Sequence, residues 1–195
     1  MNKPLGSLLL AASALLAPAE TLHALSPGDR APEFSLPVAD GSGAISLARE
    51  RAAHAATVVM FISTRCPVSN AYDDRMEALE KAYAPRGVRF IGVNSNVDEP
   101  VPEIVAHARQ HGFTFPVAKD ERSRTADAYG AEHTPEIFVV DREGVVRYHG
   151  RIDENRDDPA GVRSPDLRNA LDALLAGRGV PVAATKAFGC SIKRG

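Results

Sequence analysis

Three runs of mostly apolar and β-branched residues recur along the middle of the chain. They occupy positions 57–62, 88–93 and 137–140, and none shows the regular polar alternation of a half-exposed strand. This pattern is typical of strands that are buried on both faces of a sheet. A short extended piece is expected at 115–117. A turn at 141–144 predicts that residues 145–149 pair back as a hairpin strand.

Helical spacing of apolar residues separates these strands. Helices are expected at 67–84, 102–111 and 122–129. The first would present one apolar face made of Tyr72, Met76, Leu79 and Tyr83. A last helix follows Ser164, the predicted N-cap, with Pro165 at its first position and Gly177 at its end. Its apolar stripe would be Leu167, Leu171, Leu174 and Leu175.

The order of these elements predicts an α/β fold with one central mixed β-sheet flanked by helices. Strands joined by helices pair in parallel through right-handed crossovers, and the later hairpin adds an antiparallel edge. Residues 33–36 and 45–47, on either side of Asp40-Gly41, predict an N-terminal β-hairpin extension. We expect one domain at 26–177 and a C-terminal tail at 178–195 without clear periodicity.

The N-terminus has the features of a secretory signal peptide. Lys3 supplies a positive charge, an uncharged apolar stretch follows, and Ala17-Pro18-Ala19 is a small-x-small cleavage pattern. Residues 1–19 are therefore the expected signal, with an alternative cut after Ala24. We expect a periplasmic or secreted protein that has no membrane segment after cleavage. An uncleaved N-terminal anchor is the alternative interpretation.

Composition excludes several classes of protein. The 195 residues carry a formal net charge of -2, whereas a dedicated nucleic-acid binder would need a basic face. There are two cysteines, Cys66 and Cys190, too few for a zinc ribbon or a disulfide-rich miniprotein. Export would allow these two cysteines to form a disulfide that persists.

Cys66 stands where a buried strand gives way to a helix. Free backbone N–H groups at a helix start favour a thiolate, and the neighbouring Arg65 would add a positive charge if its side chain turns inward. Since the thiolate is the reactive form, the position favours a nucleophilic cysteine. An inert, buried structural cysteine is the alternative.

Pro135 directly precedes the apolar run at 137–140. A proline there would remove a hydrogen bond from a central strand, so either a cis Thr134–Pro135 peptide or an ordinary trans proline ending the loop is compatible with the residues. The pattern alone leaves both open.

Four segments resemble the thioredoxin-like superfamily, in its redoxin or peroxiredoxin-like (AhpC/TSA-related) branch. They are residues 27–36, residues 61–72 with their single-cysteine Cys66-Pro67-Val68-Ser69 motif, residues 134–136 and residues 189–193. The resemblance covers nearly all of the chain after the signal. It implies a thioredoxin fold, a redox-active Cys66 and a cis Pro135 packed against it.

The chain also departs from that resemblance. Ser69 replaces the second cysteine of Cys-x-x-Cys, and Met60 stands where thioredoxins keep a buried carboxylate. Arg65 replaces the usual tryptophan. Of the peroxiredoxin pattern Pro-x-x-x-Thr-x-x-Cys, Ser63 keeps the hydroxyl but Val59 replaces the proline. These changes place both ordinary dithiol reductase activity and efficient peroxidase activity in question.

Cys190 has three candidate roles. It would resolve an oxidised Cys66 by forming a disulfide with it, it would be a structural staple of the tail, or it would pair between chains. In the proposed chemistry, Ser69 and the backbone at Thr134 bind the thiolate or the partner chain. We expect no resident cofactor.

Two groups of histidines are candidate metal ligands. His107 and His111, at i and i+4, are favoured as a solvated helix face. His133 would join Cys66 as a copper ligand pair in a weaker alternative. The following acidic residues are expected to be surface charge: Asp73, Asp74, Asp153, Glu154, Asp157 and Asp158.

We therefore expect an exported thiol-based oxidoreductase that uses Cys66 for thiol–disulfide exchange or peroxide reduction. Its expected partners are protein or small-molecule disulfides or peroxides and an external thiol reductant. The alternative is a non-catalytic module that binds copper or a partner protein in the same groove.

Overall fold

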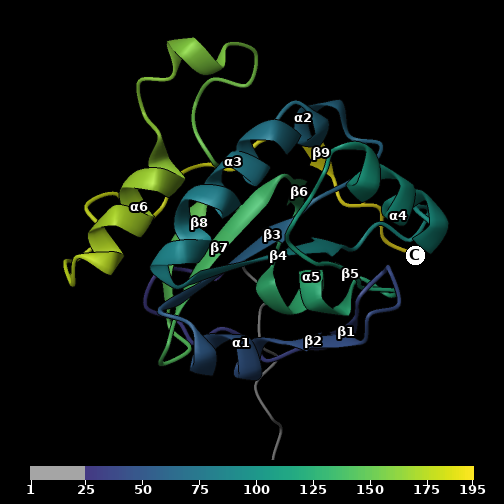
Figure 1. Ribbon diagram of the computed structural model, residues 1–195, viewed down its shortest axis with the longest axis horizontal. Helices are drawn as coiled ribbons and strands as arrows, with labels where there is room; N and C mark the ends of the chain where they lie inside the picture. The colour runs from purple at the N-terminus through teal and green to yellow at the C-terminus, as the bar shows by residue number, and fades with distance from the viewer. Residues whose placement is uncertain (1–24) are drawn as a thin grey trace, which may run out of the picture.

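The computed structural model describes residues 25–195, so the expected signal peptide lies outside the described residues. Five strands form one central sheet (Figure 1) in the order β5-β4-β3-β7-β8. They are β3 (Ala56–Phe61), β4 (Val88–Asn94), β5 (Val117–Lys119), β7 (Glu136–Asp141) and β8 (Val146–Gly150). β3 pairs in parallel with β4, and β4 with β5, whereas β7 is antiparallel to both β3 and β8. The predicted mixed sheet is confirmed.

Helices cover both faces of this sheet, as the unbroken apolar run of β3 requires. Val58 and Met60 face one apolar cluster, which includes residues of α3 (Asp73–Tyr83), α4 (Val101–Gln110) and α6 (Asp166–Leu175). Val59 and Phe61 face the other, with residues of α1 (Leu47–Ala53) and α5 (Arg124–Tyr129). The alternation of side chains along a strand therefore divides β3 between two cores. No helix within 25–195 has the length and apolarity needed to cross a bilayer.

The N-terminal hairpin is present, with one correction to its second strand. β1 (Ser35–Pro37) pairs antiparallel with β2 (Ala44–Ser46), and Leu36 lies opposite Ile45. Leu47 was expected in the strand but begins α1, a helix that the sequence pattern did not predict. Leu47 is fully buried in the second core, so its apolar character reflects packing rather than strand pairing.

The helix expected at 67–84 is interrupted. α2 (Pro67–Asn70) has Ala71 as its C-cap, and a separate helix, α3, begins after its N-cap residue Tyr72. A 3₁₀ turn, η1 (Ala84–Arg86), follows α3. The amide of Tyr72 bonds to the carbonyl of Ser69, three residues back, which tightens the chain and ends the first helix. The four residues of the predicted apolar face are nevertheless all buried.

The start of the last helix also differs from expectation. α6 begins at Asp166, with Pro165 as the N-cap residue and no side-chain cap. Ser164, the predicted N-cap, instead donates from its hydroxyl to Asp166 Oδ1 at 2.6 Å. Asp166 also accepts from Arg151 at 2.7 Å, so the carboxylate gathers the polar contacts at this helix start.

The C-terminal segment packs along the sheet and ends beside Cys66. Ala183 and Thr185 exchange backbone hydrogen bonds with His149 of β8. Further on, β9 (Cys190–Ser191) pairs antiparallel with β6 (His133–Thr134), and Figure 1 shows this small pair next to α2. No periodicity indicated β9, because two residues are too short to show any.

Candidate active site

Cys66 lies where the loop after β3 meets α2, and it is 2% exposed. It is the N-cap residue of α2, with Pro67 at the first helical position. Its Sγ accepts hydrogen bonds from the amide of Ser69 at 3.3 Å and from the amide of Cys190 at 3.4 Å. The thiol in turn donates to the carbonyl of Thr134 at 3.1 Å. Three separate segments therefore meet at one sulfur.

The surroundings of Cys66 favour its thiolate. Burial raises the pKa of the thiol, but hydrogen bonding with Cys190, with Thr134 and with the amide of Ser69 lowers it by more. The pKa of Cys66 therefore lies below its ordinary value. Because α2 has only four residues, these direct bonds, rather than a helix dipole, are the cause.

Cys190 is the second thiol of the site. Both cysteines are free, and Cys190 is the less buried of the two. Burial, the hydrogen bond to Cys66 and the charge of the Cys66 thiolate all raise the pKa of Cys190. The pair is thus asymmetric, since Cys66 gives up its proton more readily and Cys190 keeps its own.

The loop before β7 holds the carbonyl that faces Cys66. The Thr134–Pro135 peptide bond is cis. Behind the loop, Glu136 accepts from the amides of Glu132 and His133, both at 2.8 Å, and contacts His149 Nε2 at 2.7 Å. Burial raises the pKa of Glu136, but these hydrogen bonds lower it by a larger amount, so the pKa of Glu136 lies below its ordinary value. A buried carboxylate therefore fixes the position of Thr134.

Gly189 brings the tail close to this loop. Its φ is +154°, and a Cβ at this position would overlap the carbonyl oxygen of Thr134. Only glycine fits such an approach. Thr134 consequently lies opposite Cys190 in the β6–β9 pair, which places the second thiol beside the first.

A buried carboxylate, Glu99, organises the loop that leads into Cys66, and no sequence pattern pointed to it. Its side chain accepts from Ser63 Oγ at 2.5 Å, from the Thr64 amide at 2.8 Å and from Asn94 Nδ2 at 2.5 Å. Ser63 Oγ also accepts from the amide of Cys66 at 3.0 Å. The Ser63 hydroxyl therefore donates its hydrogen bond to Glu99. Its contact with Cys66 is to the backbone amide and not to the sulfur.

Arg65 and Ser69 contribute differently from what was expected. Arg65 is half exposed and turns to Glu103 at 2.6 Å and Asp98 at 3.6 Å, so its charge is neutralised away from Cys66. The Glu103 hydrogen bond raises the pKa of Arg65, and the same bond lowers the pKa of Glu103 to about 2. Ser69 touches the sulfur through its amide, while its hydroxyl accepts from the Ser63 amide at 3.2 Å.

The two predicted histidine groups have different surroundings. The ring of His133 approaches Glu136 at 3.8 Å, and within 25–195 no contact joins it to the Cys66 sulfur. His107 and His111 are not a solvated helix face, because both approach the buried Asp73.

Two of the expected surface acids are buried. Asp73 is 2% exposed and Asp153 is 4% exposed. Asp153 binds Arg75 at 2.8 Å and Tyr72 Oη at 3.1 Å, so it anchors the start of α3. The expectation was wrong because the partners of these acids lie far away in the sequence.

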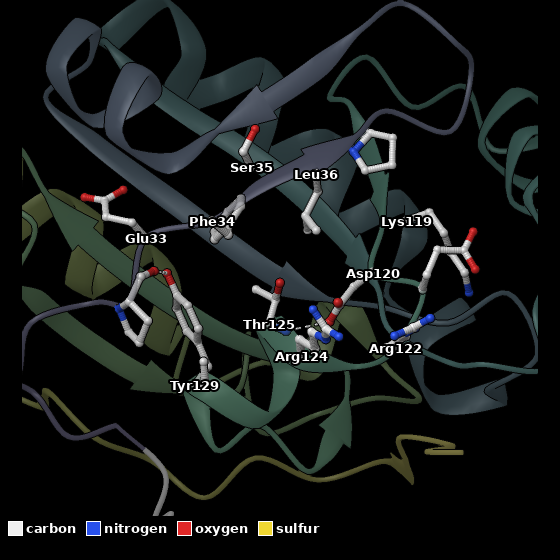
Figure 2. Close-up of a pocket in the computed structure, with 14 residues that line it drawn as sticks. Glu33, Phe34, Ser35, Leu36, Lys119, Asp120, Arg122, Arg124, Thr125 and Tyr129 are labelled. Carbon is white, nitrogen blue, oxygen red and sulfur yellow. Dashed lines mark hydrogen bonds between the residues drawn. The ribbon is translucent and has the colours of Figure 1, made fainter.

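A cavity of about 430 Å³ lies between the N-terminal hairpin and α5 (Figure 2). Phe34 and Leu36 line one wall, and Tyr129 and Thr125 of α5 line another. Neither cysteine lines it, so this hollow does not belong to the thiol site.

Two relatives of known sequence share part of this chain. Rv2521 of Mycobacterium tuberculosis, named as a putative peroxiredoxin, is 31% identical over 135 residues, which are 67% of this chain and 80% of that protein. The thiol-disulfide oxidoreductase ResA of Geobacillus thermodenitrificans is 31% identical over 87 residues. These are 45% of this chain, and the match spans 49% of the length of ResA.

Solved structures show the same fold. Protein SMc02350 from Sinorhizobium meliloti 1021 superposes with a TM-score of 0.81 at 34% identity, over 89% of this chain and 97% of that one. A protein from Chlorobium tepidum, described as a putative thiol:disulfide interchange protein DsbE, superposes with a TM-score of 0.65 at 24% identity, over 78% of this chain and 99% of that one. The expected thioredoxin-like fold is therefore confirmed.

The sequence profile of the AhpC/TSA family matches residues 27–149, a range that contains Cys66, the cis proline and all five strands of the sheet except the last residue of β8. The chain belongs to the AhpC/TSA family.

Proposed function

We propose that this protein is a thiol–disulfide oxidoreductase in which Cys66 is the nucleophile and Cys190 is the resolving thiol. The observation that carries the proposal is the position of Cys190, whose amide donates a hydrogen bond to the Cys66 sulfur at 3.4 Å and so places the second thiol beside the first. The lowered pKa of Cys66 and the raised pKa of Cys190 support this division of roles. In thiol–disulfide exchange a thiolate attacks the disulfide, and a second thiol then releases the product from the mixed disulfide.

The chemistry proceeds in two balanced steps. The Cys66 thiolate attacks one sulfur of a substrate disulfide, a Cys66–substrate bond forms, and the other substrate sulfur leaves as a thiolate that takes a proton. Cys190 then loses its proton and attacks Cys66, which forms the Cys66–Cys190 disulfide and releases the second substrate thiol. The substrate is reduced by two electrons. An external thiol reductant restores the two cysteines in the same way.

Substrate access requires β9 to move. Cys66 is almost fully buried, and β9 occupies the hydrogen-bonding edge of β6, which consists of His133 and Thr134. An extended substrate segment would form the same backbone hydrogen bonds with β6 once β9 leaves. The β6–β9 ladder pairs only two residues on each strand, and its opening would also break the adjoining bond from the Ile192 amide to the Glu132 carbonyl.

Disulfides fit the site better than peroxides. In peroxide reduction, a hydroxyl close to the sulfur would hold the incoming oxygen. The Ser63 hydroxyl occupies that place in the sequence pattern, yet it donates to Glu99 and accepts from backbone amides. We therefore propose disulfides as the main substrates. The apolar N-terminal pattern supports action after export, in the periplasm or outside the cell.

The test is oxidation of the purified, reduced protein with one equivalent of a small disulfide, followed by mass mapping without reductant. We expect a Cys66–Cys190 disulfide in the native chain and a trapped mixed disulfide on Cys66 in C190S. C66S should stay largely unmodified, and the neighbouring S191A should behave as the native chain. The proposal fails if Cys190 in C66S reacts with the disulfide as fast as the native chain does, or if hydrogen peroxide oxidises the pair much faster than disulfides do.

A further inference from the structure

Three side chains that can bind a metal meet between α3 and α4, away from the thiol pair. Asp73 is the first residue of α3, and His107 and His111 lie one turn apart at the end of α4. One ligand atom from each side chain lies within 4.8 Å of those of the other two. Asp73 Oδ2 is 3.0 Å from His107 Nε2 and 3.4 Å from His111 Nδ1.

The Asp73 carboxylate is buried, and its Oδ2 faces the two imidazoles without forming a hydrogen bond to either. Asp73 is 2% exposed, and Oδ2 makes no hydrogen bond. The two imidazole nitrogens are close enough to donate, so it is their direction and not their distance that prevents a hydrogen bond. A buried carboxylate oxygen without a hydrogen bond is costly in a folded protein. The arrangement is the one expected if Asp73 Oδ2 and the two imidazole nitrogens all face one ion between them.

The spacing of these atoms matches a zinc site. Zn²⁺ binds histidine nitrogen at about 2.0–2.1 Å and carboxylate oxygen at about 2.0–2.2 Å, usually with tetrahedral geometry. Two ligand atoms of such a tetrahedron are therefore roughly 3.3 Å apart. The two distances from Asp73 Oδ2, 3.0 and 3.4 Å, lie on either side of this value.

The local surroundings hold the rings in place and leave one side open. The ring centroids of His107 and His111 are 4.4 Å apart, and Phe113 contacts both rings at 5.9 and 6.2 Å. The side chains of His107 and His111 are 13% and 27% exposed, so solvent can reach the outer face of the cluster. A water molecule from that side would complete a four-ligand shell.

We propose that Asp73, His107 and His111 bind one divalent transition-metal ion, of which Zn²⁺ is the best fit. Two imidazoles and one carboxylate are ligands that Zn²⁺ accepts, whereas Mg²⁺ and Ca²⁺ prefer oxygen ligands throughout. The ion would join α3, which follows Cys66, to α4. That helix also carries Glu103, which binds Thr64 and Arg65 in the loop before Cys66.

The test is titration of the full, reduced, chelator-treated protein with Zn²⁺, followed by calorimetry, and with Co²⁺, followed by its visible absorption. We expect one ion per chain and a Co²⁺ spectrum without a sulfur-to-metal charge-transfer band. H107A and H111A should each weaken Zn²⁺ binding by at least about tenfold, since even the loss of a group that only supports a ligand costs that much. H54A, which removes a histidine at the end of α1, should bind like the native chain.

A variant without cysteines tests the metal site independently of the proposed function. C66S with C190S should abolish disulfide exchange and leave Zn²⁺ binding unchanged. Binding that disappears in that double variant, or that survives in both H107A and H111A, would overturn the metal site. So would the absence of saturable binding in the native chain. If H107A does not fold, the more exposed H111A decides the question. The Tm gives an independent readout, because Zn²⁺ should raise the Tm of the native chain and not that of the histidine variants.

Discussion

The backbone amide of Cys190 donates a hydrogen bond to the sulfur of Cys66 across 3.4 Å, although 124 positions separate the two residues. The contact joins the start of a helix to a strand that no local pattern predicts. Of the influences that lower the pKa of Cys66, the Cys190 thiol is the largest, and it opposes a greater effect of burial. The acidity of Cys66 therefore depends on the presence of β9.

Replacing Cys190 by alanine should raise the pKa of Cys66, because it removes the side chain whose hydrogen bonding lowers that pKa. The pH midpoint of Cys66 alkylation, measured by mass spectrometry, reports this change. S191A is the matched control, because its side chain is exposed and makes no contact with Cys66. A midpoint in C190A equal to that of the native chain would show that the Cys190 side chain has no such role.

Substituting Gly189 by alanine should open the site. The new Cβ would overlap the Thr134 carbonyl, so β9 must move away from β6. At a pH where Cys66 is ionised in every variant, we expect Cys66 to be alkylated about tenfold faster or more, because an overlap of this kind costs enough to populate the open state. A Cβ added to Gly179 would meet no neighbouring atom within 4 Å, and G179A is therefore the control. Equal rates in both variants would mean that β9 does not limit access.

Glu136 should make the stability of the protein pH-dependent. Its folded-state pKa is lowered relative to the unfolded chain, so its stabilisation is complete above the ordinary glutamate value of about 4.3 and is lost as the pH falls through the lower, folded value. At neutral pH, E136Q should lower the free energy of unfolding by about 1–3 kcal/mol. Urea unfolding across pH would show this difference shrink in acid, whereas E143Q, in an exposed turn, should match the native chain.

Glu99 should be important for the stability of the loop before Cys66. E99A would leave the Ser63 hydroxyl, the Thr64 amide and the Asn94 amide without an acceptor. Loss of such a buried acceptor costs on the order of 2–4 kcal/mol. Denaturant unfolding measures this, with E121A as an exposed control. An unfolding free energy within about 0.5 kcal/mol of the native value, the range of surface substitutions, would refute the expectation.

Features that depend on neighbours along the chain could be predicted from the sequence. The buried strands β3, β4 and β7 show as apolar runs, since a strand covered on both faces has no solvent-exposed positions. The position of Cys66 at the start of a helix followed from the pattern of apolar residues, which changes from a continuous run ending near Phe61 to helical spacing after Cys66. The short break at Ala71–Tyr72 did not, because both sides of the break keep the same apolar spacing.

Features that depend on distant partners could not be predicted. Arg65 would have added a positive charge near Cys66 if its side chain turned inward, but Glu103 of α4 binds its guanidinium. Asp73 was assigned to the surface because aspartate is usually exposed, and only the folded chain brings the α4 histidines to it. Glu99 follows no motif, and its importance comes from three donors that converge on it in space.

The pairing of β9 with β6 also has a consequence for biosynthesis. Cys66 leaves the ribosome well before Cys190, so for the interval between them the nascent chain contains a cysteine whose cover has not yet been made. Any oxidant or foreign thiol met in that interval competes with the native partner. Correct maturation therefore depends on the rest of the chain arriving and docking before an outside thiol captures the uncovered sulfur.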